Sequence, residues 1–210
     1  MAYADFTSLE QVQQRFDLRM REATGRYAHI PDRVPGTVLT TTIARNLALL
    51  PISSNERMRT EFLIAPVLSE IWELAREQIT LFSGAIFDVA PAEGLAGVCD
   101  FLIVNVPHTP VVTTPVVVIG EAKHGDRYNA LPQCIAGMVA AGRANAQAGA
   151  DGPVGGALTD GRRWVFLELT SDHAREIIIE RAEYEVPRDL PRILAILTAL
   201  ATRTATQVAA

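Results

Sequence analysis

The stretch that decides the fold is PVVVIGEAK at residues 115–123. Its first half is apolar and rich in valine, which favours a central strand covered on both faces of a sheet. The stretch then ends in a glutamate and a lysine separated by one alanine. Because residues i and i+2 of a strand point to the same face, Glu121 and Lys123 are predicted to project together from the end of this strand.

Lys123 is the only lysine of the chain, whereas the other 18 basic residues are arginine. Arginine stays protonated, while a desolvated lysine can lose its proton and carries a compact point charge. The chain could have used arginine for any generic positive charge, so position 123 is interpreted as one that needs an ammonium or an amine. Chance is the alternative, but few random positions follow a buried strand two residues after an acid.

Segments on both sides of this stretch predict the rest of an α/β sandwich with a mixed sheet. Apolar periodicity predicts an amphipathic helix over residues 7–23 and a short helix over 41–50. A further helix follows from residue 53, and Pro132 opens another that runs to about residue 148. Strands are predicted at 80–90, 97–106, 115–123, 155–158 and 164–170, and an added hairpin at 176–180 and 184–186. A closing helix is predicted over 190–202.

The helix from residue 53 carries an acid on its apolar stripe. Ser53 and Glu56 fit a capping box, and Pro66 is expected to kink the helix or to mark a restart. Glu61 extends the apolar stripe, and an acid there is costly without a partner. One alternative is that Glu61 is a helix-end carboxylate beside a neighbouring arginine, Arg57 or Arg59. Glu70 lies near the same stripe and is its rival.

Asp100 is a lone acid in the apolar strand that precedes residues 115–123. If these two strands form a hairpin, Asp100 lies beside Glu121. Adjacent carboxylates repel and raise one pKa unless a cation lies between them, and carboxylate oxygens with open water positions suit magnesium. The alternative is an internal salt bridge from either acid to Lys123.

Composition narrows the class of protein. The chain has 210 residues, 49% of them hydrophobic, and a formal net charge of −5. This is enough for one globular domain with a substantial core, and it argues against a surface coated in positive charge, although a local basic groove remains possible. Cys99 and Cys134 are too few for a disulfide scaffold, and no Cys/His cluster suggests zinc. No phosphate-binding loop, leader or membrane-spanning segment is visible, so a cytoplasmic setting without membrane partners is expected.

Taken together, these residues resemble the PD-(D/E)xK nuclease superfamily. The likeness rests on Asp100, on Glu121-Ala122-Lys123 at the end of the next strand, on Glu61 upstream and on Gln133 in the following helix. Residues 156–166 are similar to a hairpin of restriction-endonuclease-like members. The resemblance covers residues 53–170, and it departs from the motif at Cys99, where the family has proline.

The resemblance implies a role for each of these residues. Asp100 and Glu121, with the Ala122 carbonyl, would hold Mg²⁺, with Mn²⁺ as a substitute. Lys123 would position or deprotonate a water molecule or neutralise developing charge, and Glu61 would be an outer or second-metal ligand. Gln133 would orient Lys123 or the water, or touch the substrate backbone, unless it is a solvated residue of the first turn.

Further side chains are weaker candidates. His124 is a possible general base, although a residue just after a strand is more often exposed. Candidates for contacts with phosphates, each of which also fits a solvated surface charge, are Arg127, Arg143, Arg162 and Arg163.

The implied fold is α/β, with a restriction-endonuclease-like α-β-β-β-α-β core whose mixed central sheet is flanked by helices. Residues 53–210 would form this nuclease domain, and residues 1–52 an N-terminal helical extension packed on it. The implied function is metal-dependent hydrolysis of phosphodiester bonds in nucleic acid, expected to be DNA. The alternative is an inactive nuclease-fold binding or regulatory module. Symmetric cutting of a duplex would require a homodimer, formed through the N-terminal helices or the C-terminal helix.

Overall fold

The computed structural model describes residues 2–49, 55–122, 127–150, 152–171, 173 and 175–203. Its helices are α1 (Leu9–Phe16), α2 (Thr37–Leu47), α3 (Glu56–Arg59), α4 (Ala65–Ala75), α5 (Leu131–Gln147) and α6 (Leu190–Ala201), with the π-helical turn η2 (Thr60–Ile64) and the 3₁₀ turns η1 (Tyr3–Asp5), η3 (Pro91–Glu93) and η4 (Arg127–Ala130). Its strands are β1 (Arg19–Ala23), β2 (Thr80–Ile86), β3 (Val98–Val104), β4 (Val116–Ala122), β5 (Val154–Thr159), β6 (Arg163–Leu169), β7 (Glu176–Glu180) and β8 (Tyr184–Glu185).

The strands form one mixed eight-stranded sheet in the order β1-β7-β6-β5-β4-β3-β2, with β8 paired to β6. Strands β2, β3 and β4 are antiparallel neighbours. β4 and β5 are parallel, because α5 carries the chain back over the sheet between them. The predicted hairpin of the strands that carry Asp100 and Glu121 is therefore confirmed, and the protein is a mixed α/β fold.

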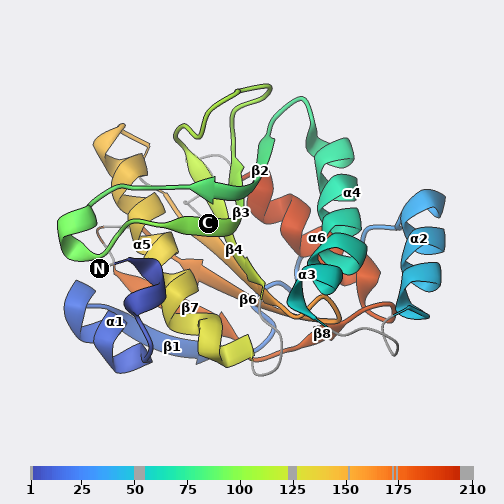
Figure 1. The fold of residues 1–210 in the computed structure, drawn as a ribbon, viewed down its shortest axis with the longest axis horizontal. Coiled ribbons are helices and arrows are strands. Elements are labelled where there is room, and N and C mark those ends of the chain that lie inside the picture. Colours follow the sequence, from blue (N-terminus) through green and yellow to red (C-terminus); the bar gives the residue numbers. More distant parts are fainter. Residues whose placement is uncertain are drawn as a thin grey trace.

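Helices cover both faces of this sheet (Figure 1). One face packs α5 and α1 against a core that includes Leu102 and Ile119. The other packs α4, α6 and part of α2 against a core that includes Phe101 and Val118. Successive strand residues thus enter opposite cores, which explains why the β3 and β4 segments are apolar throughout.

The N-terminal region differs from the predicted helical extension. The helix expected over residues 7–23 ends at Phe16, where Asp17 adopts a left-handed conformation with φ of 52°. Residues 19–23 then form β1, which pairs in parallel with β7 and becomes an edge of the sheet. The helical prediction was wrong beyond Phe16 because Met20, although at helical spacing, packs against the sheet core in an extended segment.

The helical region before β2 is divided into three parts. The described helix begins after Asn55, whose side-chain oxygen accepts a hydrogen bond from the Met58 amide at 2.8 Å. The predicted capping box is therefore corrected to an Asn55 cap, and Ser53 itself lies outside the described residues. Pro66 stands in the first turn of α4, which follows the π-helical turn without a non-helical residue between them. The helix therefore continues through this point instead of restarting, and only its hydrogen-bond pattern changes.

Candidate active site

Asp100 and Glu121 lie next to each other at the end of the antiparallel pair β3 and β4. Phe101 is the register partner of Gly120, so the next residue outward on each strand is one of the two acids. The Ala122 amide donates a hydrogen bond to Asp100 Oδ2 at 2.8 Å. The packing of this end is tight at Gly120, because a Cβ there would lie 3.0 Å from the Phe101 ring.

Gln133 joins this pair from helix α5. Its Nε2 donates a hydrogen bond to Glu121 Oε2 at 3.0 Å, and the Gln133 side chain is half-buried. Pro132 in the first turn fixes where α5 begins, and so places Gln133 beside the end of β4. The alternative of a solvated Gln133 is therefore wrong, and its partner among the described residues is Glu121.

The two carboxylates make the electrostatic potential around them negative, as the neighbouring thiols show. Glu121 is only 3% exposed. Burial, followed by the charges of Glu121 and Asp100, raises the pKa of the neighbouring Cys99 thiol to about 12. Burial and then Glu121 also raise the pKa of Cys134 well above its ordinary value. A cation between the two acids would offset this field.

The donor set fits a hard divalent ion. Mg²⁺ is commonly held by one or two carboxylates and keeps several of its waters. Asp100 and Glu121 supply two such carboxylates, and the Ala122 carbonyl belongs to the same strand end. Within the described ranges, no group of three or more His, Cys, Asp or Glu side chains could hold a metal ion. Water or backbone oxygens would therefore have to complete the coordination.

The two candidate acids of the helical region, Glu61 and Glu70, contact other parts of the protein than the Asp100–Glu121 pair. Glu61 is half-exposed in η2 and forms an ion pair with Arg57 Nε at 2.9 Å, which is the helix-end alternative considered above. Glu70 Oε1 accepts a hydrogen bond from the Gly36 amide at 2.7 Å, at the start of α2. Both acids line an open groove of about 590 Å³ between α2 and α4 whose lining does not include Asp100 or Glu121.

Several predicted residues fall outside the described part of the chain. Lys123 and His124 follow Ala122 directly and are among these residues. Arg127 begins η4, and its side chain is likewise not described. The predicted roles of the three side chains stay predictions.

The remaining predicted arginines occupy two different places. Arg143 forms an ion pair with Glu93 at 2.7 Å, and its guanidinium lies over the Phe16 ring. It therefore connects α5 to α1 and η3. Arg162 and Arg163 are exposed in the turn between β5 and β6, where both backbone amides donate to Asp160 Oδ1. Because β5 runs parallel to β4, this turn lies at the same end of the sheet as Glu121.

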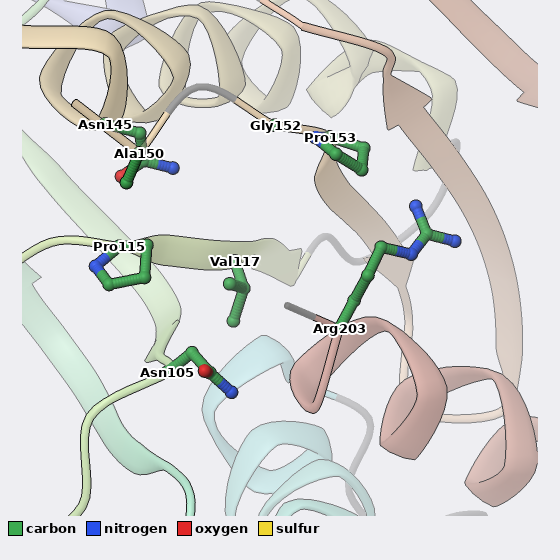
Figure 2. Close-up of a pocket in the computed structure, with 8 residues that line it drawn as sticks. All are labelled: Asn105, Pro115, Val117, Asn145, Ala150, Gly152, Pro153 and Arg203. Carbon is green, nitrogen blue, oxygen red and sulfur yellow. The ribbon is translucent and has the colours of Figure 1, made fainter. Parts of the chain in front are cut away.

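A small, partly open pocket lies at the opposite end of β4 (Figure 2). Pro115 and Val117 line it from the beginning of the strand, together with Asn145 and Arg203. The Asn145 side-chain amide accepts from the Val116 amide and donates to the Val116 carbonyl. The pocket is thus a separate feature and contributes nothing to the Asp100–Glu121 pair.

Sequence reasoning missed Arg59, which it considered only as a partner for Glu61. Arg59 Nη1 donates to the Asp160 carbonyl at 3.3 Å and so connects α3 to the turn between β5 and β6. The two residues are 101 positions apart in the chain, so no local pattern could have found this contact.

The chain matches no protein-family model and no curated protein. Within the described residues, no helix combines the length and the apolar character that crossing a membrane requires.

Proposed function

We propose that this protein is a metal-dependent nuclease that hydrolyses phosphodiester bonds, with DNA as its substrate. The proposal rests on a cluster of hydrogen-bonded side chains where β3 begins and β4 ends. There Asp100 accepts the Ala122 amide, and Glu121 accepts the side chain of Gln133. Two carboxylates held in this way at a strand end fit the coordination of a divalent ion.

The order and directions of the elements support the finer assignment to a restriction-endonuclease-like core. From α4 the chain forms β2, β3 and β4, then α5 and β5. The first three strands are antiparallel neighbours, and β5 is parallel to β4. This is the α-β-β-β-α-β arrangement that the resemblance to PD-(D/E)xK nucleases implies.

In the proposed site, Asp100, Glu121 and the Ala122 carbonyl would hold the ion. The bound ion would lower the pKa of a coordinated water and stabilise charge on the phosphate. The Ala122 amide fixes the orientation of the Asp100 carboxylate, and Gln133 fixes that of Glu121. Lys123, two residues after Glu121, would place its ammonium toward the water or the developing negative charge.

Cleavage of plasmid and single-stranded DNA with Mg²⁺ or Mn²⁺ tests this function. We expect cutting by the wild type and its loss in Asp100→Asn and in Lys123→Arg, which keeps the charge but replaces the amine. Asp17→Asn is the matched control, since Asp17 is 90% exposed and lies before β1, in a left-handed conformation that asparagine tolerates. Absence of cutting by the wild type, or equal cutting by Asp100→Asn and Asp17→Asn, would refute the proposal.

A binding or regulatory module without turnover is the second candidate. The ion pair of Glu61 with Arg57 favours it, because this acid is engaged away from the carboxylate pair. A bound ligand stabilises the folded state by mass action. If Mg²⁺ and Mn²⁺ leave the melting temperature unchanged in both the wild type and Asp100→Asn, the module is favoured. A metal-dependent rise that Asp100→Asn abolishes favours the enzyme.

A further inference from the structure

Arginines in this protein are mostly paired with carboxylates, but those around the turn between β5 and β6 are not. Examples of paired arginines are Arg21, Arg26, Arg143, Arg181, Arg192 and Arg203. Among the described residues, Arg59, Arg162 and Arg163 have no carboxylate within ion-pair distance, although Glu185 lies opposite Arg163 on β8. Arg59 and Arg162 therefore have neither an ion pair nor an acidic residue as a register partner among the described residues.

Arg59 is half-buried and incompletely satisfied. A single bond of 3.3 Å, from Nη1 to the Asp160 carbonyl, holds its guanidinium. Its buried Nε has no hydrogen-bond partner in the described part of the chain, and the same is true of Trp164 Nε1 nearby on β6. A buried donor left unpaired destabilises the fold. These two buried nitrogens thus have no acceptor among the described residues.

Packing places Arg59 against the turn itself. A Cβ added at Gly161 would lie 3.4 Å from the Arg59 Cβ and 3.2 Å from the Leu63 Cβ. The helical segment α3–η2 therefore packs closely against the end of β5, where the φ of 87° at Gly161 also favours glycine. These contacts place Arg59 beside the turn.

The turn lies beside the carboxylate pair. Ala122 is the register partner of Thr159, and Asp160 follows Thr159 directly. The same Ala122 donates its amide to Asp100. The acids point to the face of the sheet that α5 covers, whereas Arg59 approaches from the face that α4 covers. The turn and the acids share one end of the sheet, so a nucleic acid that crosses this end would bring a phosphate toward the turn.

We infer that Arg59, together with Arg162, binds a backbone phosphate of the nucleic acid beside the carboxylate pair. This inference rests on the proposed function, since it assumes a phosphodiester substrate. A guanidinium presents a planar fork of donors that matches two phosphate oxygens. The phosphate would accept from the Nη groups of Arg59, because its Nε is buried.

Binding of a short fluorescein-labelled DNA duplex tests the inference without catalysis. Anisotropy is measured in EDTA over a series of KCl concentrations, for the wild type, Arg59→Gln and Arg162→Gln. Each variant is expected to bind about tenfold more weakly and to reduce the slope of log K against log salt by about 0.9. Arg181→Gln, which removes an exposed arginine paired with Glu22 beyond β7, is the control and should change neither value.

Arg59→Lys is the second variant, because it keeps a charge at this half-buried position if the glutamine variant folds poorly. It should retain the salt slope but lose affinity, since an ammonium lacks the fork. Equal affinity and slope in Arg59→Gln and Arg181→Gln would overturn the inference. So would an Arg59-dependent rise in melting temperature with inorganic phosphate but unchanged DNA binding, because the site would then take only free phosphate. DNA binding that depends on Arg59 without any cleavage would support the inference while contradicting the nuclease proposal.

Discussion

Glu121 shows how a single residue can combine structure and chemistry. A charged carboxylate that is 3% exposed is costly unless hydrogen bonds or a cation compensate it. The Gln133 amide provides one such hydrogen bond from a different element. Glu121 lies near the end of β4, beside Asp100 at the start of β3, and together they concentrate negative charge that would attract a cation.

The first prediction concerns Gln133. Gln133→Leu removes the hydrogen bond that orients Glu121, and loss of such an outer partner typically costs 10–100-fold in metal affinity. We therefore expect about tenfold weaker Mn²⁺ binding by isothermal titration calorimetry, with the fold retained. Gln147→Leu is the matched control, because Gln147 is the exposed last residue of the same helix and should leave affinity unchanged. Equal affinities in the two variants would show that Gln133 does not support the site.

The second prediction concerns the pH dependence at Cys134. Burial, then the charge of Glu121, raises the pKa of this thiol in the folded state. The native state thus keeps the proton after the unfolded chain has lost it. The stabilisation is complete below the unfolded pKa of about 8.5 and decreases above it, by roughly 1.4 kcal/mol per pH unit.

Urea unfolding at neutral and alkaline pH measures this effect. The wild type should lose more stability between the two conditions than Cys134→Ala, which lacks the thiol. The same loss in both proteins would show that Cys134 does not titrate in this way.

At the scale of elements, the segment α3–η2–α4 decides which acids are available to the site. The π-helical turn lies directly before Pro66, where the regular hydrogen-bond pattern has to change. Glu61 in this turn pairs with Arg57 one turn earlier, whereas Glu70 on α4 holds the Gly36 amide at the start of α2. The two rivals for the helical acid therefore have different structural roles.

The third prediction separates these roles. Glu70→Ala should destabilise the fold by about 1 kcal/mol, because the Gly36 amide at the start of α2 loses its acceptor. Glu61→Ala removes only an exposed i,i+4 ion pair and should leave the urea midpoint close to that of the wild type. If Glu61→Ala instead abolishes Mn²⁺ binding, Glu61 belongs to the metal site, as the resemblance implies.

At the scale of the whole molecule, a buried carboxylate connects the two ends of the chain. Glu168 on β6 is 2% exposed and accepts from Arg26, which follows β1, and from Arg203, which follows α6, the latter at 2.6 Å. The N-terminal strand and the C-terminal helix are thus attached to the same central strand. α1 and α6 also pack apolar residues into the two cores.

The fourth prediction tests this connection. Glu168→Gln leaves two arginines without their buried counter-charge and should lower the free energy of unfolding by about 3 kcal/mol. Glu22→Gln is the control, since Glu22 forms an exposed ion pair with Arg181 and should have little effect. Chemical denaturation monitored by circular dichroism compares the two. If Glu168→Gln changes the free energy of unfolding only slightly, hydration of the two arginines compensates for the lost ion pairs.

The local sequence determined the strands and the main helices. The valine run of β4, the apolar segment of β3 and the proline at the start of α5 each carry their signal within a few residues. They could therefore be predicted, as could the adjacency of Asp100 and Glu121 once the hairpin was assumed. The strand β1 could not be predicted from local sequence, because Arg19–Ala23 forms a strand only through its pairing with Glu176–Glu180, more than 150 residues later.

Tertiary structure alone decided which polar groups meet. Gln133 contacts Glu121, Glu70 contacts Gly36, and Arg59 contacts Asp160, in each case from a different element. The partner of a side chain depends on helix placement and strand register, which are fixed by the packing of both cores. The spacing of residues in the sequence identifies side chains capable of chemistry, here the acids at the end of β3 and β4. Only packing determines which of them act together.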